Sequence, residues 1–448
     1  MKPPALNIGA SANQRPRRAK ANLLTPLGLP AELPADWQSV ALRKLDELRH
    51  KYRSLQLYLD ICVRCGACAD KCQFFLGTGD PHNMPVARAE LLRQVYRRRN
   101  LTDKLLNEWY TYFNQCSECR RCAVFCPFGI DTAELTMAAR EIMASVGVAT
   151  KYVAEVVKKV HDIGNNLGIP EAAWRDSCQF LEKELKEETG ADIKIPVNEE
   201  GAEVLLVAPS ADLFANTDTM IGYAKLFHAA GVSWTTSTYA SEGGNFGLFL
   251  NYEHLKKVNK RIVDAAKQLK VKRVVMGECG HAWRAAQAFT DTLNGPLDFL
   301  ATPRPEHICE FAVRMLRDGR IKVNKAANDG HAVTYHDPCN VARAGGMLEE
   351  PREILRAVVS DFREMPADTI RERTFCCGAG GGMLADELMD IRMKGALPRI
   401  EAFRITGAEY LATPCAICKA QFPEVFKHYG VKAEVVGVID LLGKAIII

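Results

Sequence analysis

The chain has 448 residues, of which 48% are hydrophobic and 25% charged, so it is long enough for two or three domains with cores of their own. Its net charge of +4 is too small to indicate a nucleic-acid partner, and no apolar run approaches the roughly 20 residues that cross a bilayer. Residues 1–35 lack the apolar core of a signal peptide. We therefore expect a cytoplasmic protein with reduced thiols, whose sixteen cysteines are mainly metal ligands and whose membrane link, if any, comes through a partner.

The N-terminal third is predicted to be helical after a short arm. Residues 1–34 are rich in Pro, Ala and basic side chains without periodicity, which indicates a flexible arm or a segment that orders against a partner. Apolar residues at helical spacing predict helices over 35–60, between the two close-spaced cysteine runs, and over 150–187, where Pro170 suits a first turn. A basic stretch is interpreted as a solvated face, with docking of an acidic partner as the alternative: Arg88, Arg93, Arg97, Arg98, Arg99 and Lys104.

After a polar patch at 186–202 the pattern changes to short apolar strands separated by helical segments, which is α/β alternation. The strands are expected at Val204–Ala208, Val232–Thr235, Arg273–Met276, Ala332–Tyr335 and Tyr410–Ala412.

The α/β region is also repeated. Val204-Leu-Leu-Val-Ala-Pro-Ser210 resembles Val333-Thr-Tyr-His-Asp-Pro-Cys339, and Val274-Val-Met-Gly-Glu-Cys279 resembles Tyr410-Leu-Ala-Thr-Pro-Cys415. Glu242-Gly-Gly-Asn-Phe-Gly stands where Cys376-Cys-Gly-Ala-Gly-Gly stands. We predict a multidomain α+β and α/β protein, made of a flexible arm (1–34), a helical domain that holds both close-spaced cysteine runs (35–150), a helical linker (151–200), a degenerate lobe (201–330) and a complete lobe (331–448).

Two cysteine runs share the spacing C-x2-C-x2-C-x3-C, and the second is followed by Pro127 where the first has Gln73. This is the ferredoxin spacing for two cubane [4Fe-4S] clusters, in which the fourth cysteine of each run ligates the other cluster. A zinc knuckle is the alternative for one such run, but two identical runs favour two iron–sulfur clusters that transfer electrons one at a time. The predicted ligand sets are Cys62, Cys65, Cys68 and Cys126 for one cluster, and Cys116, Cys119, Cys122 and Cys72 for the other.

Five further cysteines follow the pattern C-x36-CC-x37-CxxC: Cys339, Cys376, Cys377, Cys415 and Cys418. Adjacent cysteines are poor ligands for one zinc, and five thiols exceed what one zinc or one cubane needs. Five thiolates suit a larger, irregular iron–sulfur centre in which one sulfur bridges two irons. Two of the three groups follow predicted strands, at the carboxyl ends where open α/β sheets bind their ligands.

The cysteine pair begins a glycine-rich turn, 378–382, in which Gly378 and Gly380 are expected to let the backbone approach a cluster and direct N–H groups at sulfur. A phosphate loop is the rival interpretation of this turn. It fails because Met383 replaces the third glycine and no Lys-Ser/Thr follows. The C-terminal CxxC alone also fits a thioredoxin-like redox pair, which the other three cysteines disfavour.

These patterns resemble the CCG motif of heterodisulfide reductase catalytic subunits. The fused D subunit of that enzyme and the iron–sulfur subunits of glycolate and glycerol-3-phosphate dehydrogenases share the arrangement of ferredoxin runs followed by CCG lobes. The most specific resemblance is to the K subunits (DsrK) of Dsr membrane complexes. It is carried by Tyr335-His-Asp-Pro-Cys-Asn-Val-Ala-Arg343, Thr374-Phe-Cys-Cys-Gly-Ala-Gly-Gly-Gly382, Asp386-Glu-Leu-Met-Asp-Ile-Arg-Met-Lys-Gly-Ala-Leu-Pro-Arg399 and Cys415-Ala-Ile-Cys-Lys-Ala-Gln-Phe-Pro-Glu424.

The resemblance implies that the five cysteines hold one noncubane [4Fe-4S] cluster that makes or breaks sulfur–sulfur bonds. It also implies electron exchange between a membrane cytochrome b subunit of a DsrMKJOP complex, linked to quinone, and a disulfide or trisulfide of the small sulfur carrier DsrC. The chain would then be peripheral on the inner face of the cytoplasmic membrane. Ser210 and Gly243-Gly244 replace three of the motif's cysteines in the first lobe, so a second noncubane cluster is not expected.

Two alternatives stay open. The first is an electron-transfer subunit of a flavin-dependent glycolate, lactate or glycerol-3-phosphate dehydrogenase, which requires a flavoprotein partner. The second is a scaffold that zinc stabilises. The physiological direction, disulfide reduction or thiol oxidation, also stays open.

Several polar residues near the motif are candidates for a role in it. Cys279 and His281 are expected either to face the cluster, with His281 as a proton donor, or to form a buried structural pair. His336 and Asp337 are expected either to deliver protons to a leaving thiolate or to cap the strand end.

Overall fold

The computed structural model describes residues 4–242 and 244–448. These form two compact units. The first comprises the chain up to Lys158 together with Phe246–His254 and Glu372–Ala402, and the second comprises Lys159–Asn245, Leu255–Arg371 and Phe403–Ile448. Because the units interleave along the chain, the domain boundaries expected from the sequence stay a prediction.

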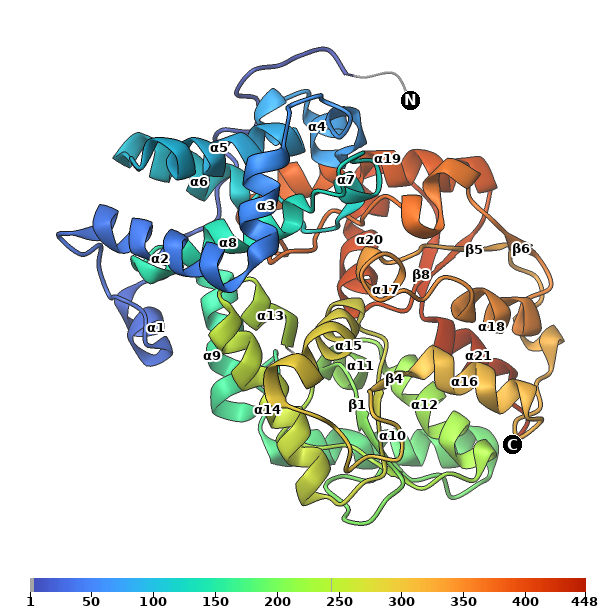
Figure 1. Ribbon diagram of the computed structural model, residues 1–448. Coiled ribbons are helices and arrows are strands. Elements are labelled where there is room, and N and C mark those ends of the chain that lie inside the picture. The colour runs from blue at the N-terminus through green and yellow to red at the C-terminus, as the bar shows by residue number, and fades with distance from the viewer. Residues whose placement is uncertain (1–3, 243) are drawn as a thin grey trace. The chain divides into compact units, whose positions relative to one another are not determined.

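The first unit is built from helices (Figure 1). They are α1 (Ala21–Leu24), α2 (Trp37–Lys51), α3 (Arg53–Ile61), α4 (Gln73–Thr78), α5 (Pro85–Arg98), α6 (Asp103–Phe113), α7 (Arg121–Val124) and α8 (Thr132–Ser145), with most of α9 (Lys151–Ile163) and α19 (Met389–Thr406) and parts of α13 (Gly244–Leu248) and α14 (Tyr252–Gln268). The α8 helix packs against α2, α5 and α6, and its apolar face closes their common core.

The N-terminal arm differs from the flexible segment expected from its composition. The Ser11 hydroxyl donates to the Asp80 carboxylate at 2.8 Å, and the Gln115 side-chain amide donates to the Ser11 carbonyl at 2.7 Å. Leu24 and Leu27 are buried. Individual polar anchors and two apolar side chains therefore hold the arm, and neither leaves a periodic signal in the sequence.

Two predicted helices are each divided. The helix expected over 35–60 ends at Lys51 and restarts at Arg53, because Tyr52 has an extended backbone (φ −114°, ψ 94°). The helix expected over 150–187 becomes α9 and α10 (Glu171–Thr189), with Gly164 in the left-handed region at φ 99° and Pro170 as the residue before α10.

The second unit contains two four-stranded parallel sheets. The strands are β1 (Val204–Val207), β2 (Trp234–Thr235), β3 (Arg273–Met276), β4 (Glu306–His307), β5 (Val333–Tyr335), β6 (Phe362–Arg363), β7 (Tyr410–Ala412) and β8 (Glu434–Val436). The first sheet has the order β2-β1-β3-β4 and the second β6-β5-β7-β8. The identical order confirms two α/β lobes of the same topology. Residues 204–207 are all buried, as expected for a parallel strand covered on both faces.

The helices of this unit follow the same duplication (Figure 1). They are α10, α11 (Ser210–Phe214), α12 (Thr217–Ala230), α15 (Gly280–Asn294), α16 (Ile308–Arg317), α17 (Cys339–Ala342), α18 (Glu350–Val358), α20 (Ala416–Tyr429) and α21 (Val438–Ala445). The α12 helix of the first lobe packs against α21 of the second, and α16 of the first packs against α18 of the second. The two lobes therefore contact each other through equivalent pairs of helices. Gly222 and Gly443 let α12 and α21 approach closely, because a Cβ on Gly443 would lie 2.6 Å from the Gly222 Cα.

No helix among the described residues is long and apolar enough to cross a membrane.

Candidate metal centres

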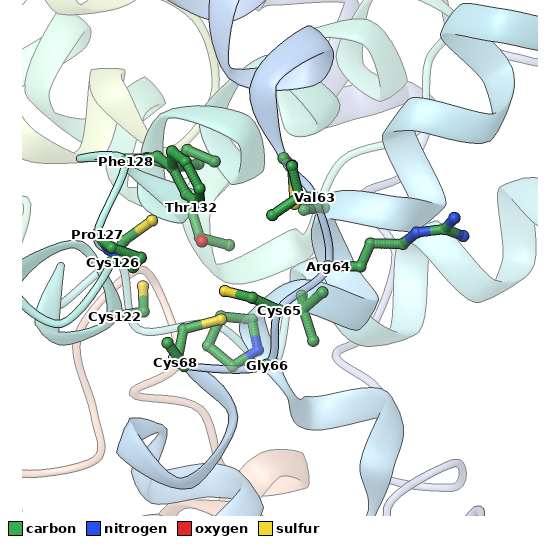
Figure 2. Close-up of a pocket in the computed structure, with 16 residues that line it drawn as sticks. Val63, Arg64, Cys65, Gly66, Cys68, Cys122, Cys126, Pro127, Phe128 and Thr132 are labelled. Atoms are coloured by element: carbon green, nitrogen blue, oxygen red, sulfur yellow. The ribbon is translucent and has the colours of Figure 1, made fainter.

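The first candidate centre is a pocket of about 420 Å³ lined by Cys62, Cys65, Cys68, Cys122 and Cys126. Figure 2 shows the thiols of Cys65, Cys68, Cys122 and Cys126 pointing toward a common space, with the Arg64 side chain pointing away from it. Cys65 is exposed, unlike the other cysteines of the two runs. Three cysteines of the first run and two of the second, Cys122 and Cys126, therefore line one pocket, and which four of them bind a cluster stays a prediction.

The second candidate centre is a pocket of about 370 Å³ lined by Cys72, Cys116, Cys119 and Cys122. Cys122 thus lines both pockets. Burial raises the pKa of Cys116, and the nearby Arg88 opposes this effect. Nowhere in the described chain do three His, Cys, Asp or Glu side chains lie close enough to hold a single metal ion. Thiols of both runs around one space match the ligand set of a four-iron cluster, in which each thiolate binds a different iron.

Arg88 corrects the prediction that the basic stretch is a solvated face. Its side chain is 1% exposed, and it donates to the Tyr112 carbonyl at 2.8 Å and to the Cys72 Sγ at 3.7 Å. Arg93 is also buried, whereas residues 97–99 remain exposed. The buried guanidinium places a positive charge beside a thiol of the second pocket, where a cluster would carry negative charge.

The pair Cys376-Cys377 lies buried in the first unit, in the turn that precedes α19. Gly378 has φ 97°, and its N–H donates to the Cys376 Sγ at 3.4 Å, as expected for a glycine that aims the backbone at sulfur. Gly380 is buried and its carbonyl accepts from the Met383 N–H at 3.2 Å. Gly381 has φ 65°, and a Cβ there would lie 2.6 Å from the Cys116 carbonyl oxygen.

Two buried arginines fasten this turn to the loops of the second pocket. Arg121 donates from Nε to the Arg373 carbonyl at 2.9 Å and from Nη1 to the Lys71 carbonyl at 3.1 Å, and it stacks on the Phe375 ring at 3.9 Å. Arg140 donates to the Gly381 carbonyl at 2.6 Å and to the Cys116 carbonyl at 3.0 Å. Sequence reasoning missed both residues, because a buried arginine that bonds carbonyls has no local pattern.

Cys339, Cys415 and Cys418 lie buried in the second unit. Cys339 follows β5 and Cys415 follows β7, and these strands are paired with Tyr335 opposite Ala412, so both thiols leave the same edge of the sheet. Cys415 is the residue before α20, and the positive end of the helix dipole favours a thiolate there. His336 Nε2 lies 3.5 Å from the Cys418 Sγ.

Asp337 is fixed by a fully buried ion pair. Arg352 donates to its two carboxylate oxygens at 2.6 and 2.8 Å, and both side chains are 0% exposed. The Arg371 N–H donates to the same carboxylate at 2.9 Å. These three bonds tie Asp337 to the protein framework and hold the turn between β5 and Cys339 in place, which favours the capping interpretation over proton delivery.

Cys279 and His281 are both buried in the second unit. The Cys279 Sγ accepts from the Ala282 N–H at 3.4 Å, and α15 begins against α17, with Gly280 packed on Val341. Hydrogen bonding to Cys418, followed by that to His281, holds the pKa of Cys415 well below its usual range. Whether Cys279 and His281 face a cluster or form a buried structural pair stays a prediction.

Comparisons with known proteins agree with these centres. A family model described as a 4Fe-4S dicluster domain matches residues 58–130, and one described as a cysteine-rich domain (CCG) matches residues 333–423. Over 93% of its length the chain is 42% identical to the Hdr-like menaquinol oxidoreductase iron-sulfur subunit 2 of Archaeoglobus fulgidus, of which it covers 84%. The chain belongs to the family of Hdr-like iron–sulfur subunits.

More distant relatives of this Hdr-like chain include the D subunit of the dihydromethanophenazine:CoB–CoM heterodisulfide reductase of Methanosarcina mazei, at 26% identity over 87% of this chain and 94% of that protein. The EtfAB:quinone oxidoreductase of Syntrophomonas wolfei is 23% identical over 87% of this chain and 58% of that protein. The chain is therefore an iron–sulfur oxidoreductase subunit. The resemblance to heterodisulfide reductase subunits is confirmed, and the narrower one to DsrK stays a prediction.

One feature of the Hdr-like fold was missed from the sequence. Lys419, one residue after Cys418, is buried and donates from Nζ to Asp212 and Glu278 of the first lobe, both at 3.1 Å. The Ala416 N–H also donates to the Glu278 carbonyl at 2.8 Å. The first lobe thus holds the start of α20, which follows Cys415 and contains Cys418.

Proposed function

We propose that this subunit is a thiol–disulfide oxidoreductase with two cubane [4Fe-4S] clusters and one noncubane [4Fe-4S] cluster. The cubane ligands are the two crossed sets that line the two pockets. The noncubane ligands are Cys339, Cys376, Cys377, Cys415 and Cys418. The observation that carries the proposal is that one cysteine-rich family model, residues 333–423, spans all five of these cysteines.

The side chains around the thiols fit this chemistry. When bound, a noncubane cluster supplies adjacent irons that hold both sulfurs of a parting disulfide, which avoids a free thiyl radical. His336 lies within reach of the Cys418 sulfur and is placed to hold a proton there. The Asp337–Arg352 pair keeps the adjoining turn rigid. The two pockets would carry the electrons one at a time.

The partners are inferred from relatives and from the DsrK resemblance. The Archaeoglobus fulgidus relative is named as a subunit of a menaquinol oxidoreductase. We propose that this chain exchanges electrons with quinone through a membrane cytochrome b subunit of a Dsr-type complex, on the inner face of the cytoplasmic membrane. The substrate would be the disulfide or trisulfide of the sulfur carrier DsrC. Cys65, exposed beside the exposed Val63 and Phe128, marks the pocket that a partner can approach.

The test is iron content and turnover of the anaerobically purified chain. We expect about twelve iron atoms per chain and interconversion of carrier thiol and disulfide with an artificial redox dye. Cys377→Ser should abolish the noncubane paramagnetic signal and the turnover. The matched control is Cys178→Ala, which removes a buried cysteine of α10 that lies in an apolar core. Retention of both properties in Cys377→Ser would refute the proposed ligand set.

A pull-down distinguishes the alternative function. Capture of cytochrome subunits and the sulfur carrier supports the proposal. Capture of a flavoprotein instead would favour an electron-transfer subunit of a flavin-dependent glycolate, lactate or glycerol-3-phosphate dehydrogenase.

A further inference from the structure

Gln73 occupies the position where the second cysteine run has Pro127, and its side chain is 1% exposed. Its Oε1 accepts from the Cys376 N–H at 2.8 Å. Gln73 also lines the pocket of Cys72, Cys116, Cys119 and Cys122. One amide therefore touches the backbone of the cysteine pair and borders the second cubane pocket.

The nitrogen end of the same amide is left without an acceptor. Because Oε1 accepts from a backbone N–H, the orientation of the amide is fixed and Nε2 is the donor end. Nε2 is buried and makes no hydrogen bond within the described residues. A buried donor without an acceptor is destabilising, so this donor points to a ligand that accepts the bond.

The helix that carries Gln73 is held firmly. Gln73 is the first residue of α4, and α4 packs backbone to backbone on α19, which follows the cysteine pair. A Cβ on Gly77 would lie 1.9 Å from the Lys394 carbonyl oxygen, and one on Gly395 would lie 2.4 Å from the Phe74 ring. The backbone of Gln73 is thus positioned by the packing of α4 on α19, in addition to the hydrogen bond of the amide.

We propose that Gln73 is an amide bridge between two redox centres: Oε1 holds the Cys376 backbone, and Nε2 donates to a sulfur of the cluster bound by Cys72, Cys116, Cys119 and Cys122. A donor to cluster sulfur stabilises the more negative, reduced state and raises the reduction potential. The bridge also fixes the separation over which one electron passes. One centre is oxidised by one electron and the other reduced by one, no bond forms or breaks, and Gln73 keeps both amide protons. The inference rests on the proposed function only for the identity of the second centre.

Two readouts test the bridge in the cluster-loaded full chain. The first is hydrogen–deuterium exchange of the Cys376 amide, measured by mass spectrometry of its peptide. The second is the reduction potential of the cubane clusters, from a redox titration followed by electron paramagnetic resonance. Neither depends on turnover or on the noncubane cluster. If iron content shows only the two cubanes, the proposed function fails while the Gln73 inference is still tested.

Gln73→Leu removes both hydrogen bonds without adding charge. We expect at least a tenfold faster exchange of the Cys376 amide. At a fixed applied potential, the ratio of reduced to oxidised second cubane should be about tenfold lower, which corresponds to a reduction potential lower by about 59 mV. Gln73→Glu keeps the acceptor, so the Cys376 amide should stay protected while the potential falls. Gln73→Pro guards against a folding defect, because proline is tolerated at a first helical position and the second run has one there. It should lower the potential as Gln73→Leu does.

Gln115→Leu is the matched control. Gln115 is also a buried amide beside a cubane cysteine, but it bonds Ser11 and the Gln14 carbonyl. It should leave both readouts unchanged. The proposal is overturned if Gln73→Leu leaves the potential unchanged, whatever the exchange shows, or if Gln115→Leu moves both readouts equally.

Discussion

The buried pair of Arg352 and Asp337 gives the sharpest stability prediction. Replacing Arg352 with Met removes two hydrogen bonds to the Asp337 carboxylate and leaves the bond from the Arg371 N–H in place. Glu364, the other partner of Arg352, is 29% exposed and can turn to water. The loss of folding stability therefore comes mainly from Asp337, whose side chain is 0% exposed.

The magnitude follows from that burial. Breaking a fully buried ion pair by removing one partner costs about 3–5 kcal/mol, because a desolvated charge is left behind. Removing both charges is far less harmful, so Asp337→Leu with Arg352→Met should recover most of the loss. Arg356, one turn further along α18, is 54% exposed and pairs with Glu364 at 3.9 Å, so Arg356→Met should cost no more than about 1 kcal/mol.

The assay is anaerobic urea denaturation of the cluster-loaded protein, followed by circular dichroism. The four proteins to compare are the wild type, the two single Arg variants and the double variant. A loss below about 1 kcal/mol for Arg352→Met, or a double variant no more stable than the single one, would refute the reasoning from buried charge.

Three further predictions concern proton uptake, charge near a cluster and backbone approach. Burial raises the pKa of Glu278 to about 8, so the folded protein holds a proton that the unfolded chain releases near pH 4.5. The free energy of unfolding should therefore fall by up to about 5 kcal/mol as the pH rises from about 4.5 to about 8. Glu278→Gln should reduce this pH dependence, measured as the denaturation midpoint at each pH. Arg88→Met should lower the potential of the cluster at Cys72 by about 60 mV in a redox titration, because one charge-assisted hydrogen bond is worth about 1.5 kcal/mol; an unchanged potential would exclude that contact. Gly381→Ala should slow reduction of the proposed noncubane centre in rapid freeze-quench experiments, because a Cβ there would lie 2.6 Å from the Cys116 carbonyl oxygen and push the two loops apart. Gly346→Ala, at φ 71° with no atom within 4 Å of its Cβ, is the control for backbone strain alone.

The sequence predicted the strands that lie at sheet centres better than those at sheet edges. The bounds of β3 and β7 agree with the structure, and those of β1 and β5 differ by one residue. β4, β6 and β8 were missed because they are two or three residues long and include Glu306, Arg363 and Glu434. Edge strands pair on one side only and tolerate charge, so they carry no apolar run.

Buried polar contacts were less accessible to sequence reasoning than cysteine spacing. Cysteine spacing is local and fixed by cluster geometry, so the two runs could be recognised from the sequence, while the division of their thiols between two clusters stays a prediction because Cys122 lines both pockets. Arg88 and Gln73 act through partners that lie elsewhere along the chain, such as Tyr112 and Cys376. The basic residues around Arg88 and the glutamine in place of a proline at Gln73 therefore gave no indication of these contacts in the sequence.

The degenerate lobe explains how a chain with one complete CCG motif keeps two lobes. Ser210 stands where the complete lobe has Cys339, and its N–H and hydroxyl both donate to the buried Glu242 carboxylate, at 2.6 and 2.8 Å. Gly243, one of the residues that replace the cysteine pair, lies outside the described residues.

That Ser–Glu contact satisfies its own polar groups without metal, so the first lobe can lose its ligands and stay folded. What it cannot lose is its contact with α20. Asp212 and Glu278 bind Lys419, and the Glu278 carbonyl accepts the Ala416 N–H between Cys415 and Cys418. Deleting the first lobe would leave the Lys419 ammonium without its two acidic partners and the CxxC turn without its backbone anchor. The lobe without the motif is thus a positioning element for the lobe that carries it.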